Sequence, residues 1–124
     1  MQTSPKIKVC GLTREEDVNL SLSLGADYFG FILYPQSPRG VLLDRAVELA
    51  AAVPVGQRVA VDVATSLEDL KSYRDAGFDY FQIHFGADFE YSNLAEYSKI
   101  VGKDKLWLAP VSYTHLTLPT KRIV

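Results

Sequence analysis

Short, mainly apolar runs alternate along the chain with longer segments in which apolar residues recur at the spacing of a helix. The run at residues 28–33 is almost continuously apolar, as in strands that are covered on both faces. Such runs predict strands at residues 6–10, 28–33, 58–63, 79–84 and 105–109. The segments between them predict helices at residues 13–24, 44–53, 66–77 and 93–101.

The junctions between these elements carry start and stop signals. Thr13 and Glu16 fit a capping box, in which a hydroxyl and a carboxylate each accept from a backbone amide at a helix start. Ser66 and Asp69 have the same spacing and predict the start of the third helix. Two prolines and a glycine predict a loop at residues 34–40, because they cannot continue a strand.

An internal repeat supports this division. Gly-Ala-Asp-Tyr-Phe at residues 25–29 recurs as Gly-Phe-Asp-Tyr-Phe at residues 77–81, and each copy ends a predicted helix and opens a predicted strand. The chain is therefore a series of similar βα units, and consecutive right-handed crossovers of this kind produce a parallel sheet. Two architectures fit: an open doubly wound sheet, or half of an eight-stranded barrel, which takes about 250 residues in full.

Composition narrows the class of protein. The 124 residues are 48% hydrophobic and 23% charged, which is typical of one globular domain. A net charge of −2 gives no reason to expect nucleic acid or an anionic membrane as a partner. A single cysteine excludes an internal disulfide and, with two distant histidines, argues against a metal site. No signal peptide or membrane-spanning run is visible, so we expect a cytoplasmic protein.

The first predicted strand ends in the only cysteine, Cys10. Alternation along that strand places Lys6, Lys8 and Cys10 on one face. Cys10 therefore lies where the carboxyl end of a strand meets the amino end of a helix, which is where α/β proteins place their sites. Taken alone, a free cysteine is more often a small buried hydrophobe than a reactive thiol.

The sequence changes character after Pro110. Residues 111–124 show no helix period, no cap and no clean strand alternation, and residues 111–120 resemble a translated transposon-end sequencing adapter. We therefore expect residues 111–124 to be a non-native tail, and the natural protein to continue differently beyond residue 110. An ordinary strand followed by a basic tail is the alternative.

Three motifs follow one another in the first third of the chain. They are Lys-Val-Cys-Gly-Leu-Thr at residues 8–13, Gly-Ala-Asp-Tyr-Phe-Gly-Phe-Ile-Leu-Tyr-Pro at residues 25–35 and Ser-Pro-Arg at residues 37–39. In this combination and order they closely resemble the amino-terminal half of phosphoribosylanthranilate isomerase, and the resemblance covers about residues 6–110. That family is a TIM barrel. The resemblance therefore implies that residues 1–110 are the amino-terminal half of such a domain: an incomplete (β/α)8 barrel with about strands 1–5 and helices 1–4.

The resemblance also implies a reaction of tryptophan biosynthesis on a phosphorylated small molecule. This is the Amadori rearrangement of N-(5-phosphoribosyl)anthranilate to 1-(2-carboxyphenylamino)-1-deoxyribulose 5-phosphate. A general acid protonates the furanose ring oxygen and opens the ring to a Schiff base. A general base then removes the proton from sugar C2, which gives an enolamine that tautomerises to the ketone. The substrate's own iminium is the electron sink, so no cofactor is implied.

Two residues match the chemistry of that family. Cys10 matches the general base; because an ordinary thiol has a pKa of about 8.5, it needs cationic neighbours to react as a thiolate. We expect these to be Lys8 and the positive amino end of the helix after Thr13. Arg39 matches the arginine that binds the anthranilate carboxylate, although an isolated loop arginine is more often a solvated surface residue. Gly40 differs from the aromatic residue usual after this arginine, which argues against ring packing there.

Gln-Ile-His at residues 82–84 is similar to a weaker motif of the same family. Gln82 and His84 share one strand face and would line a barrel interior near its carboxyl end, which makes them candidate substrate-binding residues. A satisfied structural role is the alternative for His84. Asp62 stands where the family usually has an apolar residue. We expect it to point inward and to form a buried or half-buried ion pair with Lys8, because barrel layers take side chains from alternate strands; an aspartate facing water at a frayed strand end is the alternative.

The family's aspartate general acid and phosphate-binding loops lie, by the same resemblance, beyond residue 110. We therefore expect the 124-residue chain to be inactive alone, and its open sheet edges to favour self-association. Two other functions stay open. One is a non-catalytic half-barrel module that self-associates. The other is a different phosphate-binding barrel enzyme, such as an epimerase or indole-glycerol-phosphate synthase, which the motifs at residues 8–11 and 37–39 fit less well.

Overall fold

The computed structural model describes residues 6–86 and 92–110, and within these ranges strands and helices alternate as predicted. The strands are β1 (Lys8–Cys10), β2 (Tyr28–Ile32), β3 (Arg58–Val63), β4 (Tyr80–Phe85) and β5 (Leu106–Pro110). The helices are α1 (Glu15–Ser23), α2 (Leu43–Ala50), α3 (Leu67–Asp75) and α4 (Ser92–Val101), with a 3-10 turn at Lys103–Lys105 before β5. Residues 111–124, predicted to be a non-native tail, lie outside the described residues.

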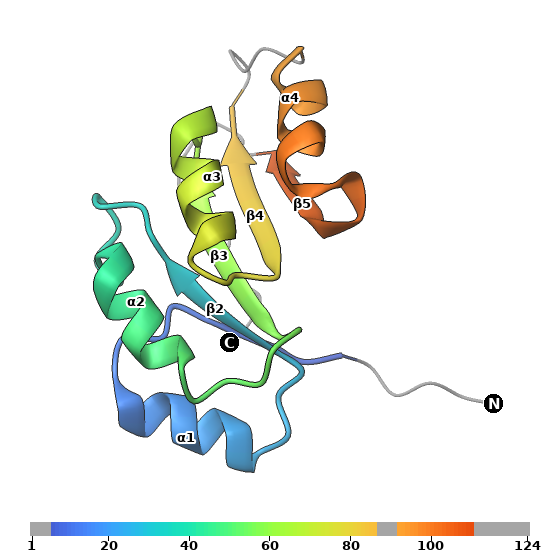
Figure 1. The fold of residues 1–124 in the computed structure, drawn as a ribbon. Coiled ribbons are helices and arrows are strands. Elements are labelled where there is room, and N and C mark those ends of the chain that lie inside the picture. Colours follow the sequence, from blue (N-terminus) through green and yellow to red (C-terminus); the bar gives the residue numbers. More distant parts are fainter. Residues whose placement is uncertain (1–5, 87–91, 111–124) are drawn as a thin grey trace, which may run out of the picture.

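The order of the strands decides between the two architectures. The strands pair in sequence order from β1 to β5, and every pair is parallel. A doubly wound sheet reverses its strand order at a switch point and carries helices on both faces. Here the order never reverses, and the four helices lie on the same side of the sheet (Figure 1). This is the winding of a barrel wall, left open in the described residues with β1 and β5 as its edges.

The hydrophobic core lies between the helices and one face of this sheet. Its strand residues are Phe29, Phe31, Ala60, Phe81 and Ile83, and its helix residues include Val18, Ala46, Leu49, Leu70 and Tyr97. Because side chains alternate along a strand, the opposite face carries the residues between these positions. We call that opposite face the inner face, since it would point to the axis of a closed barrel. The core therefore fixes which polar side chains reach the inner face.

Three aromatic rings cover the inner face near the amino ends of the strands. Tyr28 of β2 and Tyr80 of β4 meet edge to face, with ring centroids 5.5 Å apart. Trp107 of β5 stacks on Tyr80 at 4.9 Å and meets Tyr28 edge to face at 5.1 Å. The two tyrosines occupy the same position in the two copies of the internal repeat, so the repeat brings matched rings together. Contacts of this kind stabilise by about 0.5–1.5 kcal/mol beyond burial.

The helices are short. The longest in the described ranges, α4, has 10 residues, and no helix there is long and apolar enough to cross a bilayer. The predicted start of α3 is confirmed, because the Ser66 hydroxyl accepts from the Asp69 amide at 3.0 Å.

Candidate active site

Cys10 is the last residue of β1 and is half-buried on the inner face. The amides of Gly11 and Leu12 both donate to the carbonyl of Gly30 in β2, at 3.1 and 3.2 Å, which fixes the end of the strand. A Cβ on Gly30 would lie 3.2 Å from Cys10 Sγ and 3.4 Å from Lys8 Cε. Both side chains thus lie close to the same small space. The missing side chain at position 30 lets the thiol and the lysine lie side by side.

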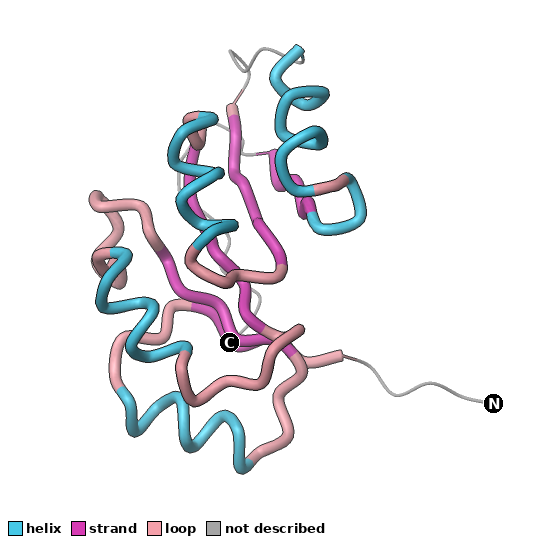
Figure 2. Tube along the Cα trace, in the orientation of Figure 1, coloured by secondary structure: helices cyan, strands magenta, loops and turns pink. Residues whose placement is uncertain are grey.

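The loop between β2 and α2 (pink in Figure 2) brings Arg39 to this strand end. Arg39 Nη1 donates to the carbonyl oxygen of Cys10 at 3.4 Å. A Cβ on Gly11 would lie 2.7, 2.8 and 2.9 Å from three atoms of the Arg39 guanidinium. The guanidinium therefore covers the backbone of Gly11, and its exposed position leaves it open to an anionic ligand. The structure brings together Cys10 and Arg39, whose roles remain predictions.

The glycine after Arg39 has a local cause. The Gly40 amide donates to the Ser37 carbonyl at 2.9 Å, and Gly40 forms a bridge with Ile32 at the end of β2. A Cβ on Gly40 would lie 2.4 Å from the carbonyl oxygen of Tyr34, a backbone atom that cannot swing away. An aromatic residue here would force the loop into another shape. The sequence showed that Gly40 replaces the family's usual aromatic residue, but it did not show this cause.

Gln82 and His84 are half-buried neighbours on the inner face of β4. Gln82 Nε2 lies 3.1 Å from His84 Nε2, within hydrogen-bonding distance. On its other side, Gln82 Oε1 accepts from Lys8 Nζ of β1. Lys8 Nζ also lies 5.8 Å from the centroid of the Trp107 ring. Sequence reasoning missed the contact between Lys8 and Gln82, because no local pattern joins residues that lie 74 positions apart.

The predicted ion pair between Asp62 and Lys8 is wrong. Asp62 lies on the helix side of β3, in register with the core residue Ile83, and is 7% exposed. Its Oδ2 accepts from the Tyr73 hydroxyl of α3 at 2.7 Å, and its Oδ1 accepts from the Val63 amide at 2.8 Å. Burial, and then the hydrogen bond to Asp62, raises the pKa of Tyr73 well above its usual value. The Tyr73 hydroxyl, a buried donor on the facing helix, therefore compensates for the burial of the Asp62 carboxylate at a position where the family usually has an apolar residue.

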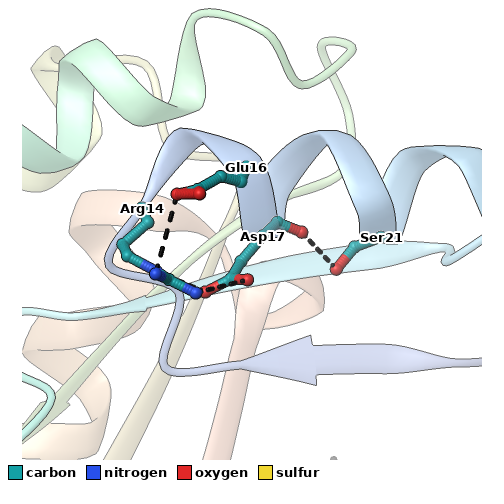
Figure 3. A network of polar contacts seen from close by, with 4 residues as sticks. All are labelled: Arg14, Glu16, Asp17 and Ser21. Atoms are coloured by element: carbon teal, nitrogen blue, oxygen red, sulfur yellow. Dashed lines mark hydrogen bonds and ion pairs between the residues drawn. The ribbon is translucent and has the colours of Figure 1, made fainter.

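The predicted capping box at the start of α1 is also wrong. Arg14 is the N-cap residue, and no side chain caps the helix. Arg14 donates from Nε and Nη2 to the Asp17 carboxylate at 3.2 and 3.3 Å, and its Nη1 lies 3.7 Å from Glu16 (Figure 3). Three acidic residues stand in this first turn and oppose the positive field of the helix end. Lys8 and the amino end of this helix were the two positive groups predicted beside Cys10, and the contacts favour Lys8.

No group of three or more His, Cys, Asp or Glu side chains within residues 6–86 and 92–110 is arranged to hold a metal ion.

Known proteins are similar to this chain in sequence and in fold. A family profile described as N-(5'-phosphoribosyl)anthranilate (PRA) isomerase matches residues 7–115. The N-(5'-phosphoribosyl)anthranilate isomerase of Aquifex aeolicus (strain VF5) is 38% identical over 103 residues, which are 82% of this chain and 48% of that protein. Monomers generated from the dimeric isomerase of Thermotoga maritima superpose with a TM-score of 0.74 at 26% identity, covering 85% of this chain and 52% of that one.

A second solved structure is of a phosphoribosyl anthranilate isomerase in complex with reduced 1-(o-carboxyphenylamino)-1-deoxyribulose 5-phosphate. It superposes with a TM-score of 0.70 at 23% identity, covers 86% of this chain and 53% of that one, and so shows the fold alone.

These likenesses confirm the incomplete (β/α)8 barrel. The chain spans about half the length of the relatives it matches. The family match also runs five residues past residue 110, into the segment predicted to be non-native. Because the match covers most of the chain, the chain belongs to the N-(5'-phosphoribosyl)anthranilate isomerase family.

Proposed function

We propose that this chain supplies the general base and the carboxylate-binding arginine of an N-(5'-phosphoribosyl)anthranilate isomerase of tryptophan biosynthesis. The observation that carries the proposal is the contact of the Arg39 guanidinium with the backbone of Cys10 and Gly11. It joins a cation suited to a planar carboxylate and a thiol suited to proton transfer. The partner is then a phosphorylated small molecule, and a cytoplasmic location is expected from the sequence.

The proposed chemistry assigns one step to each residue. Arg39 binds the anthranilate carboxylate and so holds the substrate beside β1. Once the furanose ring has opened to the Schiff base, the Cys10 thiolate takes the proton from sugar C2. The C–H electron pair moves into the iminium and forms the enolamine, and tautomerisation gives the ketone. The acid that opens the ring and the phosphate-binding loops are expected beyond residue 110, so we expect the 124-residue chain alone to be inactive.

Steady-state kinetics test this proposal in the complete protein, extended by the downstream half that its relatives carry. Cys10→Ala is expected to lower kcat by about 100-fold or more, the usual cost of losing a general base. Arg39→Lys is expected to raise KM and to leave kcat nearly unchanged, because lysine cannot pair with the carboxylate through two parallel bonds. Arg45→Lys is the matched control, because Arg45 lies on α2 and pairs there with Glu48 at the surface. Full turnover by Cys10→Ala would refute the base assignment.

The open sheet edges favour a second candidate, a non-catalytic half barrel that self-associates. Within the described residues β1 and β5 are the edges of the sheet, and an open strand edge is a template for another chain. Sedimentation velocity of the 124-residue chain separates the two: a defined, folded dimer supports the module, and a monomer argues against it.

A further inference from the structure

We infer that Gln82 and His84 are positioning residues, which together hold the ammonium group of Lys8 beside the thiol of Cys10. This rests on the proposed function, in which Cys10 is the base. It differs from the role that the sequence suggested, direct contact with substrate. The evidence is the chain of contacts that crosses the inner face from β1 to β4.

Residues of β4 and β5 contact the ammonium group of Lys8, and β2 leaves space for its stem. Its Nζ donates to Gln82 Oε1 of β4 and lies 5.8 Å from the centroid of the Trp107 ring of β5. The face of an aromatic ring attracts a cation, so both contacts favour the same position of the ammonium group. Gly30 of β2 has no side chain, and this leaves space for Lys8 Cε and Cys10 Sγ. The lysine therefore has a defined conformation beside the thiol.

The polarity of these contacts fixes the state of His84. An ammonium group has donors only, so Gln82 must turn its Oε1 toward Lys8. Gln82 Nε2 then faces His84 Nε2, 3.1 Å away, and donates to it. A ring nitrogen that accepts a hydrogen bond carries no proton. His84 is therefore neutral, with its proton on Nδ1.

This arrangement explains what each member does for the next. Neutral His84 keeps the Gln82 amide in one orientation, because the opposite orientation would place an oxygen against the lone pair of Nε2. The oriented Gln82 keeps an acceptor on Lys8, whose long flexible stem otherwise has many conformations. A cation held near the thiol stabilises the negative charge that sulfur carries when it reacts. Removing Gln82 or His84 should thus lower the reactivity of Cys10 before any substrate binds.

The first experiment measures the alkylation rate of Cys10 by iodoacetamide at pH 7. Cys10 is the only cysteine, so mass spectrometry of the 124-residue chain reports this thiol alone. Lys8→Met and Gln82→Met are each expected to slow alkylation by about threefold or more, because the cation beside the reacting sulfur is removed or displaced. Lys6→Met removes the same charge from an exposed position and is expected to leave the rate unchanged. Circular dichroism checks that each variant keeps its secondary structure.

The second experiment reads the tautomer of His84 from its ring nitrogen chemical shifts. His115→Asn leaves one histidine and makes the assignment unambiguous. We expect the Nδ1–H form in the wild type. Gln82→Glu is expected to put a proton on His84 Nε2, as the Nε2–H tautomer or the doubly protonated ring, because a carboxylate only accepts and a bare Nε2 cannot donate to it. This variant keeps an acceptor for Lys8 but sets a negative charge against the ammonium group, so Cys10 alkylation is expected to slow as well.

Either of two results would overturn the inference. One is wild-type alkylation in folded Gln82→Met, whatever Lys8→Met does; the other is a proton on His84 Nε2 in the wild type. Neither measurement needs substrate. Failure here is therefore distinct from failure of the proposed isomerase activity.

Discussion

The guanidinium of Arg39 lies so close to Gly11 that a Cβ at position 11 would come within 2.7 Å of Arg39 Nη1. Gly11 also has a φ of +82°, a left-handed conformation that residues with side chains rarely adopt. Position 11 therefore meets two requirements at once, one from the turn after β1 and one from Arg39. The turn that ends the strand is also the surface on which the arginine rests.

Gly11→Ala should separate these two requirements when it is compared with Gly25→Ala. Gly25 has a φ of +84° and open space around it, so its replacement carries the backbone strain alone. Each variant is expected to lose about 1–2 kcal/mol of unfolding free energy in urea. Only Gly11→Ala should also raise the KM of the complete isomerase, because it displaces Arg39. An equal rise in KM for Gly25→Ala would contradict a role for the contact.

The buried hydrogen bond between Tyr73 and Asp62 should couple α3 to β3. Tyr73→Phe removes the donor from a buried carboxylate and is expected to cost about 1.5–3 kcal/mol. Asp62→Asn weakens the same bond, so the double variant should cost less than the sum of the single ones. Urea unfolding of the four proteins measures this coupling, which we expect to be about 1 kcal/mol. Additive costs would mean that the two groups stabilise the fold independently.

Tyr73 should also set an alkaline limit to stability. Burial, and then the bond to Asp62, raises its pKa in the folded chain, whereas the unfolded chain keeps the ordinary value of 10.0. Above pH 10 the unfolded state loses this proton and the folded state keeps it. The free energy of unfolding then falls as pH rises, by up to ~1.4 kcal/mol per pH unit, and the tyrosine adds no pH dependence below pH 9. In a urea series from pH 9 to 11, Tyr73→Phe should show a smaller fall than the wild type; an unchanged slope would contradict the assignment.

Elements that depend on near neighbours could be predicted from the sequence. Strand β3 has the predicted bounds, and Ser66 caps α3 as its spacing to Asp69 indicated. The face to which Asp62 points could not be predicted, because its donor is a tyrosine on the following helix. Thr13 failed as a cap although its signal was local: Arg14 is the N-cap residue and pairs with Asp17, and the helix begins at Glu15 without a side-chain cap.

The candidate site likewise contains residues that the sequence could predict and contacts that it could not. Cys10 and Arg39 could be proposed because each lies in a short motif that resembles a family pattern. The contact between Lys8 and Gln82 could not, since it depends on the register of four strands and on the missing side chain of Gly30. Sequence alternation predicted the shared face of Gln82 and His84, but only the pairing of β1 to β4 brings Lys8 within reach of Gln82.

The aspartates of the internal repeat hold the start of the strand that lies next to their own. Asp27 Oδ2 accepts from the Ile7 amide at 2.8 Å, just before β1. Asp79 Oδ2 accepts from two amides at the start of β3, those of Gly56 at 2.8 Å and Arg58 at 3.1 Å. The two copies thus make the same kind of contact, Asp27 with one hydrogen bond and Asp79 with two. Replacing each aspartate by alanine should therefore lower the free energy of unfolding by different amounts.

Asp79→Ala is expected to cost about 1–3 kcal/mol of unfolding free energy and Asp27→Ala about half as much, because each amide bond to a carboxylate adds a similar amount. The exposed Asp104, in the 3-10 turn before β5, is the matched control, and its replacement by alanine should stay within about 0.5 kcal/mol. Urea unfolding of the three variants measures the order. If Asp27→Ala were as costly as Asp79→Ala, the number of amides held would not be what sets the stability of these junctions, and the shared turn itself would have to carry it.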